Sequence, residues 1–446
     1  MRALLLSSVL LALSAGTASA QAVASFDASD AVSPISVVEG VGVKVGEGTV
    51  LRPVLGIESG IISNVFFEDT SASAAGLMRL IAQVGAGSLG RARLAKTGEV
   101  DANPLTAVET GGRTASIDNQ GRFQYRADLR LVYDMYLSGN DRVTSQGGLG
   151  IGANCRGVVN PLGTWQFTFL DDLQRVIRAT NFESDQQTNR VVNLLNLRVQ
   201  FAPEGRALSA AFRFDNQMDI FESNRQQFSN RMMSALGARG NWQWLPVTRL
   251  YLDAQLGLNS GLGSDSQKVS SFPLTLKGGI QTLLSLNTTL SAHVGYTNGF
   301  YSSGPSFSAP TAGIQAGYRY SPLGRVTLGY DYLHADSINA NFFRDHVVRA
   351  SWEQGYAPFM VTVRPEVHLR AYRGITIPGA SASDRNDLIF AVSAGAHYNF
   401  RNWLAATLDY RLSLVSSDFT YMPEPGVIDD PGFVRHELLV GARAAL

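Results

Sequence analysis

The segment FQYRADLRLVYDMYL, from Phe123 to Leu137, carries all its charges on one side of a two-residue period. Arg126, Asp128, Arg130 and Asp134 occupy even-numbered positions, whereas apolar residues, tyrosine and alanine occupy the odd-numbered ones. Successive side chains of a strand point to opposite faces, so this pattern predicts a β-strand with one apolar and one charged face. The segment is much longer than the usual strand of about 5 to 6 residues. The fold must therefore offer a long strand an apolar environment on one side and a polar one on the other.

The same alternation recurs along the chain, and helical periodicity is scarce. In TRLYLDAQLGL, Arg249 and Asp253 lie opposite leucines and an alanine, and in NWLAATLDYRLSL the same holds for Asp409 and Arg411. Short breaks rich in Pro, Gly and Asn, such as NPLG and SPLG, separate some strands, and longer polar breaks separate others. The two kinds of break alternate from Gly205 to the C-terminus. We therefore expect an up-and-down meander with tight turns at one end and long loops at the other.

The segments add up to about 18 predicted strands, an even number as in bacterial outer-membrane barrels. Residues 87–121 show only a weak pattern, so 16 strands is the alternative count. The predicted strands include residues 122–137, 344–354 and, at the C-terminus, 432–446. Because proline cannot donate to a ladder, we expect a β-bulge at Pro365, inside one of the strands.

The first 20 residues have the pattern of a secretory signal peptide. A basic Arg2 precedes an apolar run from Leu4 to Leu13, and Ala18 and Ala20 match the small residues that precede cleavage. We predict a signal peptide over residues 1–20, a periplasmic segment over 21–48 and a barrel over 49–446. After the signal peptide no apolar run approaches the roughly 18 residues of a transmembrane helix.

The charge composition excludes one class of function and favours another. Lys plus Arg and Asp plus Glu are both 37, so the formal net charge is zero and the generally basic character of nucleic-acid-binding proteins is absent. Charged residues make up 17% of the chain, below the roughly 25% of soluble domains. We therefore expect something other than water to cover part of the surface. The single cysteine, Cys155, excludes an intramolecular disulfide.

These patterns predict an all-β protein, a closed antiparallel up-and-down transmembrane β-barrel. In a bilayer every backbone polar group must be paired, and closing the sheet achieves this without edges. We predict the outer membrane of a Gram-negative bacterium, with both termini in the periplasm and the long loops outside. Lipid, lipopolysaccharide and the barrel assembly machinery are the expected partners. The last strand resembles the C-terminal assembly signal of outer-membrane proteins, but it ends in Leu446 where Phe or Trp is usual.

The charged face of the predicted strands is the candidate lining of the lumen. Opposite charges on neighbouring strands can pair and brace the wall, and the remaining charges can select solutes. The predicted lumen-lining residues are Arg126, Asp128, Arg130, Asp134, Arg198, Arg213, Arg249, Asp253, Arg364, Glu366, His368, Arg370, Asp409 and Arg411.

Motifs of enzyme chemistry are missing from the sequence. We find no P-loop, no nucleophile elbow and no HExxH, and the six histidines lack metal-ligand spacing. The GAGSLG stretch from Gly85 to Gly90 matches G-x-G-x-x-G, but no helical pattern follows it, so we interpret it as the end of a strand. We expect no catalytic residues, no metal and no cofactor.

Three segments resemble a known family. LRPVLGIESGIISNVFFED, NPLGTWQFTFLDDLQR and NLLNLRVQFAPEGRALSAAFRFDNQMDIFE, within residues 51–222, are similar to the opening and early hairpins of the β-barrel porin-2 family. The resemblance implies an outer-membrane porin, a passive conduit for exopolysaccharide secretion that works with polysaccharide export proteins, and it supplies no catalytic residues. Two alternatives stay open. One is a general diffusion porin, and the other is a plugged barrel that acts as a surface-binding protein or an outer-membrane enzyme.

Overall fold

The computed structural model describes residues 42–45, 48–70, 72–88, 122–161, 163–177, 189–377, 380–424 and 427–446. The predicted signal peptide, most of the predicted periplasmic segment and most of the weakly patterned zone 87–121 lie outside these ranges. Within them, no helix combines the length and the apolar character that crossing a membrane would require.

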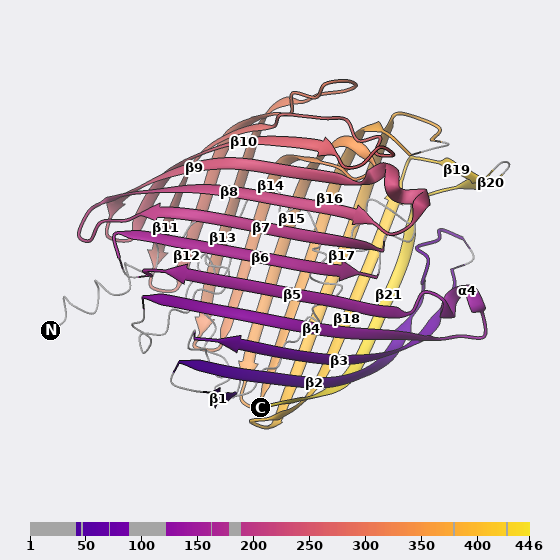
Figure 1. The fold of residues 1–446 in the computed structure, drawn as a ribbon, viewed down its shortest axis with the longest axis horizontal. Coiled ribbons are helices and arrows are strands. Elements are labelled where there is room, and N and C mark those ends of the chain that lie inside the picture. Colours follow the sequence, from indigo (N-terminus) through magenta and orange to yellow (C-terminus); the bar gives the residue numbers. More distant parts are fainter. Residues whose placement is uncertain are drawn as a thin grey trace.

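Eighteen antiparallel strands form one closed sheet (Figure 1). Each strand pairs with the next along the chain, and the barrel closes where β21 pairs with β18 on one side and β2 on the other. The predicted all-β, up-and-down barrel of 18 strands is confirmed. The strands are β2 (Thr49–Ile62), β3 (Ala75–Gly87), β4 (Phe123–Leu137), β5 (Gly148–Val159), β6 (Trp165–Val176), β7 (Arg190–Phe201), β8 (Leu208–Phe221), β9 (Arg231–Leu245), β10 (Thr248–Gly261), β11 (Leu274–Ser285), β12 (Thr288–Asn298), β13 (Ser308–Ser321), β14 (Gly324–Asp336), β15 (Ala340–Tyr356), β16 (Phe359–Ile375), β17 (Asp384–Arg401), β18 (Leu404–Ser417) and β21 (Phe433–Ala445).

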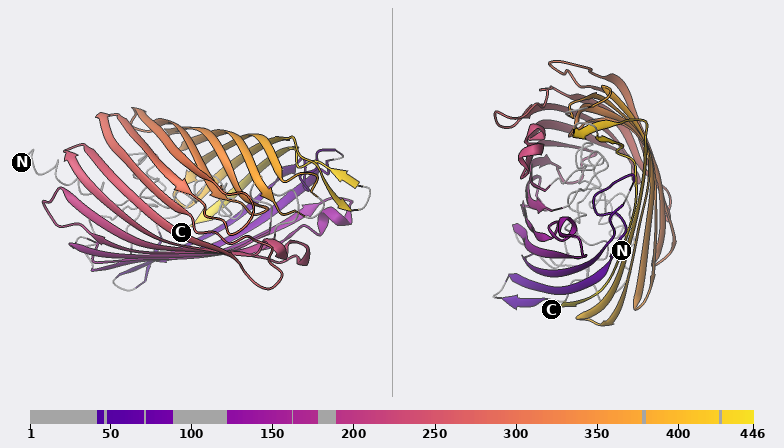
Figure 2. Two further views of the ribbon diagram at one scale, coloured as in Figure 1. Left: turned by 90° about the horizontal axis from the view of Figure 1, so that it is seen from above. Right: turned by 90° about the vertical axis from the view of Figure 1, so that its right-hand side faces the viewer.

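The two ends of the barrel differ in their connections. At one end five connections have two residues each, for example between β9 and β10 and between β17 and β18. The short strand β1 (Val43–Val45) pairs there with the start of β2. The other end carries longer loops that contain the helical turns α4 (Asp141–Thr144) and η2 (Asn224–Ser229) and the hairpin of β19 (Tyr421–Glu424) and β20 (Val427–Asp429) (Figure 1). The barrel is flattened, as the end-on view of Figure 2 shows.

The alternation in the sequence becomes two opposite surfaces of the sheet. On β10, Leu252 is 74% exposed whereas the next residue, Asp253, is 9% exposed. On β4, Leu129 is 44% exposed and Asp134 is 1% exposed. This arrangement is the reverse of a soluble domain, in which charged side chains are outside. The apolar side chains form the outer surface of the barrel, and the polar side chains form its inner face.

Aromatic side chains gather on the outer surface at the end with the short turns. They contact one another across strands: the rings of Trp165 and Phe201 lie 4.8 Å apart, and the Trp352 indole donates a hydrogen bond of 2.8 Å to the Tyr320 hydroxyl. We call this set the aromatic belt. Its exposed members are Trp165, Phe201, Trp242, Trp244, Tyr318, Tyr320, Trp352, Tyr356, Tyr398, Phe400 and Trp403.

The predicted bulge at Pro365 is wrong. Pro365 pairs with Val392 of β17 in register. Opposite Pro365, pairing with β15 is interrupted at Ala350 and Ser351 and then resumes in the same register. Proline has no backbone N–H to donate to the neighbouring strand, and here one hydrogen bond is missing but no extra residue is inserted.

A glycine at the closing seam allows β2 and β21 to approach. A Cβ added at Gly60 would overlap the carbonyl oxygen of Leu438, whereas a Cβ at Gly240 on β9 would meet nothing within 4 Å. We expect Gly60→Ala to destabilise the barrel by about 1–3 kcal/mol through overpacking, and Gly240→Ala to change its stability by less than about 0.5 kcal/mol. Heat unfolding in detergent, followed by the electrophoretic mobility of the folded barrel, measures both. Equal midpoints for the two variants would contradict the close approach at the seam.

Candidate functional site

The first group of charges on the inner face bridges the seam of the barrel. Arg79 on β3 lies between three carboxylates, 2.7 Å from Asp134, 3.5 Å from Glu58 and 4.0 Å from Glu437. Its Nε and Nη2 atoms both donate to Asp134, at 2.7 and 3.3 Å, which is the bidentate geometry that favours arginine. Arg443 of β21 is ion-paired with Glu58. Five neighbouring residues on four strands thus form one buried ion-pair group.

A second group crosses β9. Arg213 of β8 donates from Nη1 and Nη2 to the Asp253 carboxylate on β10, at 2.7 and 2.9 Å, and its Nε lies 3.3 Å from Asp215. Its side chain passes over Gly237 of β9, where a Cβ would come within 2.7 Å of Nε. Glycine is required there because any larger residue would displace the guanidinium.

A third group lies on β15 and β16. The Asp345 carboxylate accepts hydrogen bonds from Arg370 at 2.7 and 2.9 Å and lies 2.9 Å from Nδ1 of His368. Nε2 of His368 is 3.3 Å from Glu366, so the imidazole bridges two carboxylates. The Arg370 guanidinium lies over the Phe343 ring, 4.2 Å from its centroid. These contacts stabilise charges that are almost completely buried.

All fourteen predicted lumen-lining residues project from the polar face of their strands. The three groups contain Asp134, Arg213, Asp253, Glu366, His368 and Arg370. Asp409 of β18 lies 3.9 Å from Arg443 and so extends the first group to a further strand. Of the others, Arg126 pairs with Asp128, Arg364 lies 3.5 Å from Glu353, and Arg130, Arg198 and Arg249 donate to glutamine side chains. Arg411 of β18 lies directly opposite Glu437 of β21 in the register of these strands. That these residues line a conducting channel stays a prediction.

The sequence interpretation missed central members of these groups. Glu58, Arg79, Asp345, Glu437 and Arg443 were not in the predicted set, although each has the parity of a charged face. Extending the two-residue period through the shorter or less regular segments would have identified them. Their partners could not be identified in this way, because partners on different strands depend on the register between strands.

A loop narrows the barrel at the end with the long connections. Phe67, between β2 and β3, packs against Ile389, Val415 and Phe433, which are inner-face residues of β17, β18 and β21. Its ring centroid lies 5.0 Å from that of Phe433, and the Arg435 guanidinium lies 4.3 Å from the Phe67 centroid. Because these contacts are on the inner face three strands away, the loop of residues 63–70 folds into the barrel.

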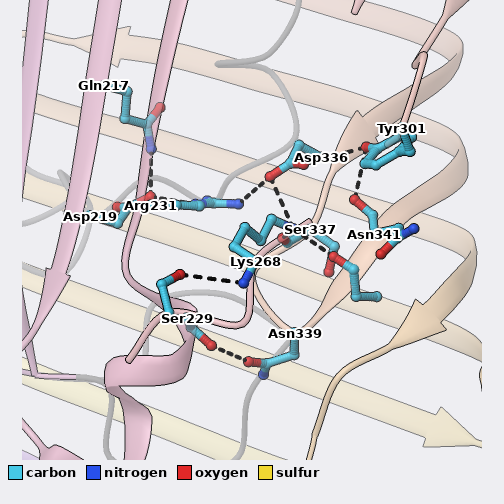
Figure 3. A network of polar contacts seen from close by, with 12 residues as sticks. Gln217, Asp219, Ser229, Arg231, Lys268, Tyr301, Asp336, Ser337, Asn339 and Asn341 are labelled. Carbon is cyan, nitrogen blue, oxygen red and sulfur yellow. Dashed lines mark hydrogen bonds and ion pairs between the residues drawn. The ribbon is translucent and has the colours of Figure 1, made fainter. Parts of the chain in front are cut away.

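A polar network joins several loops at the end with the long connections (Figure 3). The Asp336 carboxylate at the end of β14 lies 2.9 Å from Nη1 of Arg231, 3.3 Å from Nζ of Lys268 and 3.3 Å from the Tyr301 hydroxyl. Lys268 also donates to the carbonyl oxygens of Ser337 and Ala340. Asp336 thus links the start of β9 to the loops that follow β10, β12 and β14. We call this set the loop network.

Tyr301 is a fixed hydrogen-bond donor in the loop network. Burial, reinforced by the nearby Asp336 carboxylate, raises the pKa of the Tyr301 hydroxyl well above its ordinary value. The hydroxyl therefore keeps its proton and donates to the Asn341 carbonyl oxygen at 2.8 Å. Asn341 in turn donates to the carbonyls of Ser303 and Pro305, both at 3.0 Å, which attaches the loop after β12 to the start of β15.

The inner face offers ion pairs and hydrogen bonds rather than a metal site. In the part of the chain that the structure describes, no group of three His, Cys, Asp or Glu side chains is arranged to hold a metal ion. The chemistry available there is the electrostatic attraction and hydrogen bonding of polar solutes.

Comparisons with known proteins give only distant likenesses. No protein-family model matches the chain, and no curated protein does. Among solved structures, the chain is similar to OccK2 (OpdF) of Pseudomonas aeruginosa, with 12% identity, a TM-score of 0.42 and coverage of 89% of this chain and 98% of that one. The outer membrane protein OpdK of the same species has 9% identity, a TM-score of 0.44 and coverage of 89% and 99%. OccAB2 of Acinetobacter baumannii has 10% identity, a TM-score of 0.45 and coverage of 89% and 98%. None of these values indicates a shared substrate.

Removing the central arginine of the first group provides a test of the inner wall. Arg79→Met would leave Glu58, Asp134 and Glu437 without their shared cation, and breaking a buried pair in this way costs about 3–5 kcal/mol. The matched control is Arg142→Met, which removes an exposed arginine 3.2 Å from Glu68 and should cost at most about 1 kcal/mol. Urea unfolding in detergent would show the difference. Similar midpoints for both variants would mean that the buried charges are not coupled.

Proposed function

We propose that the protein is an outer-membrane porin, a passive conduit for hydrophilic solutes. The observation that carries this proposal is a closed barrel of 18 strands with an apolar outer face and a charged inner face. In a closed barrel every strand has two neighbours, so the backbone donors and acceptors are paired within the sheet, as lipid requires. The apolar outer face can then contact lipid. Barrels of about 16–18 strands are wide enough to hold an aqueous channel.

The orientation in the membrane follows from the two ends of the barrel. The aromatic belt fits a membrane–water interface, where amphipathic rings are favoured. Outer-membrane barrels have short periplasmic turns and longer outer loops, so we propose that the short-turn end and both termini lie in the periplasm and that the long loops lie outside. Lipid and lipopolysaccharide would then contact the exposed leucines, and the barrel assembly machinery would insert the chain.

The finer proposal concerns the cargo. The resemblance of residues 51–222 to the β-barrel porin-2 family supports exopolysaccharide secretion, in cooperation with polysaccharide export proteins. The predicted lumen-lining residues include more arginines than carboxylates, which suits an acidic polymer because basic side chains that line a pore favour anions.

One observation favours a second candidate, a general diffusion porin for small solutes. Phe67 packs against inner-face residues of β17, β18 and β21 at the barrel end with the long loops. A channel narrowed in this way admits small solutes more readily than a polymer.

The membrane face is tested by a pair of neighbouring substitutions on β4. Leu129→Arg places a charge on the outer face, where it costs about 2–4 kcal/mol at the bilayer midplane. We expect this variant to lose assembly into the heat-modifiable form. Arg130→Leu changes the inner face and should still assemble. The reverse outcome would show that the two faces are assigned the wrong way round.

Conduction and cargo need separate measurements. We expect the purified protein to give stable conductance steps in a planar bilayer, and complete electrical silence would indicate a plugged barrel instead. Deleting the gene in a strain without a second copy should lower surface polysaccharide. A deletion strain with unchanged polysaccharide, together with a conducting protein, would reject the exopolysaccharide cargo and support the diffusion porin.

A further inference from the structure

The wall formed by β11, β12 and β13 differs from the rest of the inner face. Its inward positions carry mainly glycine, threonine, serine and glutamine, as at Thr275, Gly279 and Gly295. The charged or titratable side chains on this wall are Lys277 of β11, His293 of β12 and, at the short-turn end of β13, Arg319. By contrast, the ion-pair groups around Arg79 and Arg370 fill the inner face elsewhere. This wall therefore carries small side chains and little charge, except around Lys277.

Lysine is rare in this protein, and its position here is distinctive. The chain has 33 arginines and only four lysines, Lys44, Lys96, Lys268 and Lys277. Lys44 lies in β1, Lys96 lies outside the described residues, and Lys268 is bound in the loop network. Lys277 is the lysine of the 18 barrel strands. The paired cations of the inner wall are arginines, whose planar fork suits a bidentate carboxylate pair, whereas a lysine ammonium is a point charge.

The carboxylates nearest to Lys277 are bound to arginines. Asp253 is directly opposite Lys277 in the register of β10 and β11, but it accepts both hydrogen bonds from Arg213. Asp331 of β14 lies 3.4 Å from Arg349. Among the described residues, no carboxylate comes within ion-pair distance of the Lys277 ammonium and no hydrogen bond to it is formed. Its positive charge is therefore available to a solute.

Glycines on the adjacent strands let side chains lie close against this wall. Gly295 faces Lys277 across the β11–β12 pair, and a Cβ there would lie 2.8 Å from Cγ of the lysine. The stem of Lys277 therefore lies along the wall instead of projecting across the barrel. Gly313 allows His293 and Asp331 to approach in the same way, because both side chains occupy the place of its missing Cβ. Lys277 is thus a partly buried cation next to small residues on the inner face.

We propose that Lys277 is an anion-binding residue on the inner wall and attracts the negatively charged group of a passing solute. The ligand class is a carboxylate or phosphate, because a single ammonium recognises charge without requiring a fixed geometry. His293 of β12 and the hydroxyl-bearing residues of the wall lie on the same inner face as Lys277. This inference rests on the proposed function, since it names the solute class that the conduit favours.

Ion selectivity in a planar bilayer is the first test. The reversal potential in a KCl gradient should show that Lys277→Met lowers the anion-to-cation permeability ratio by about threefold at about 0.1 M salt, the Coulomb factor for a unit charge about 6 Å away in water. The difference should shrink at about 1 M salt because screening is stronger. Lys277→Arg should retain the ratio, and the matched control Lys44→Met, at an exposed position of β1, should equal the wild type. A Lys277→Met channel with unchanged selectivity would overturn the inference.

A second test does not depend on conduction. The folded wild-type protein in detergent is acetylated with acetic anhydride, and the rates at Lys277 and Lys44 are compared by mass spectrometry, which four lysines make straightforward. We expect succinate or inorganic phosphate to slow acetylation of Lys277 relative to Lys44, and protection by only one of them identifies the favoured anion. Equal relative rates with and without both anions would reject the anion site. If the protein gives no conductance in a bilayer but anions still slow the acetylation of Lys277, the porin function would be rejected and the anion site retained.

Discussion

The pairing of β21 with β2 is the interaction on which the rest of the structure depends. Without it the barrel would have two open edges, and each would expose a row of backbone donors and acceptors that a bilayer cannot satisfy. The pairing extends from Val54 opposite Ala445 to Ile62 opposite Glu437, and the ion pair of Arg443 with Glu58 adds a side-chain contact across it. The paired residues are almost the whole chain apart in sequence. Closure therefore has the largest loop-closure entropy of all the strand pairings.

The buried charges of the inner face follow from the same closure. A closed sheet brings side chains from several strands toward one interior, where each charge needs a partner because isolated burial is costly. Arginine meets this need across intervening strands, as Arg213 does by passing over Gly237 to reach Asp253. Glycine at the crossed position keeps the guanidinium flat against the wall. The wall thus combines ion pairing with an inner face that protrudes little into the barrel.

The fold was predictable from the sequence wherever one face of a strand lies on the apolar outer surface and the other on the polar inner face, because the residues then alternate. β4 spans Phe123–Leu137, the segment whose alternation is strictest. β15 spans Ala340–Tyr356, whereas the pattern predicts only residues 344–354. The reason is local: outer-face Phe342 is covered by Tyr301 and Phe307, with ring centroids 5.9 and 4.9 Å away, so burial no longer alternates at this end. The loop that carries Phe67 into the barrel has no periodic sequence pattern, so its position could not be predicted. The ion-pair partners of Arg79 depend on the register between strands, which the sequence of one strand does not specify.

The alternation of β4 and β10 also bears on how such a chain reaches its destination. A continuous apolar segment would partition into the first bilayer it meets as a helix, because the gain from burying about 20 apolar residues is large. Here a charged or polar residue follows nearly every outward leucine, for example Asp253 after Leu252. A strand with this alternation is not hydrophobic enough to be held in a bilayer as a single helix. The apolar surface comes into existence only when the strands pair, so the chain can be transported as a polar polymer and become a membrane protein at the moment of folding.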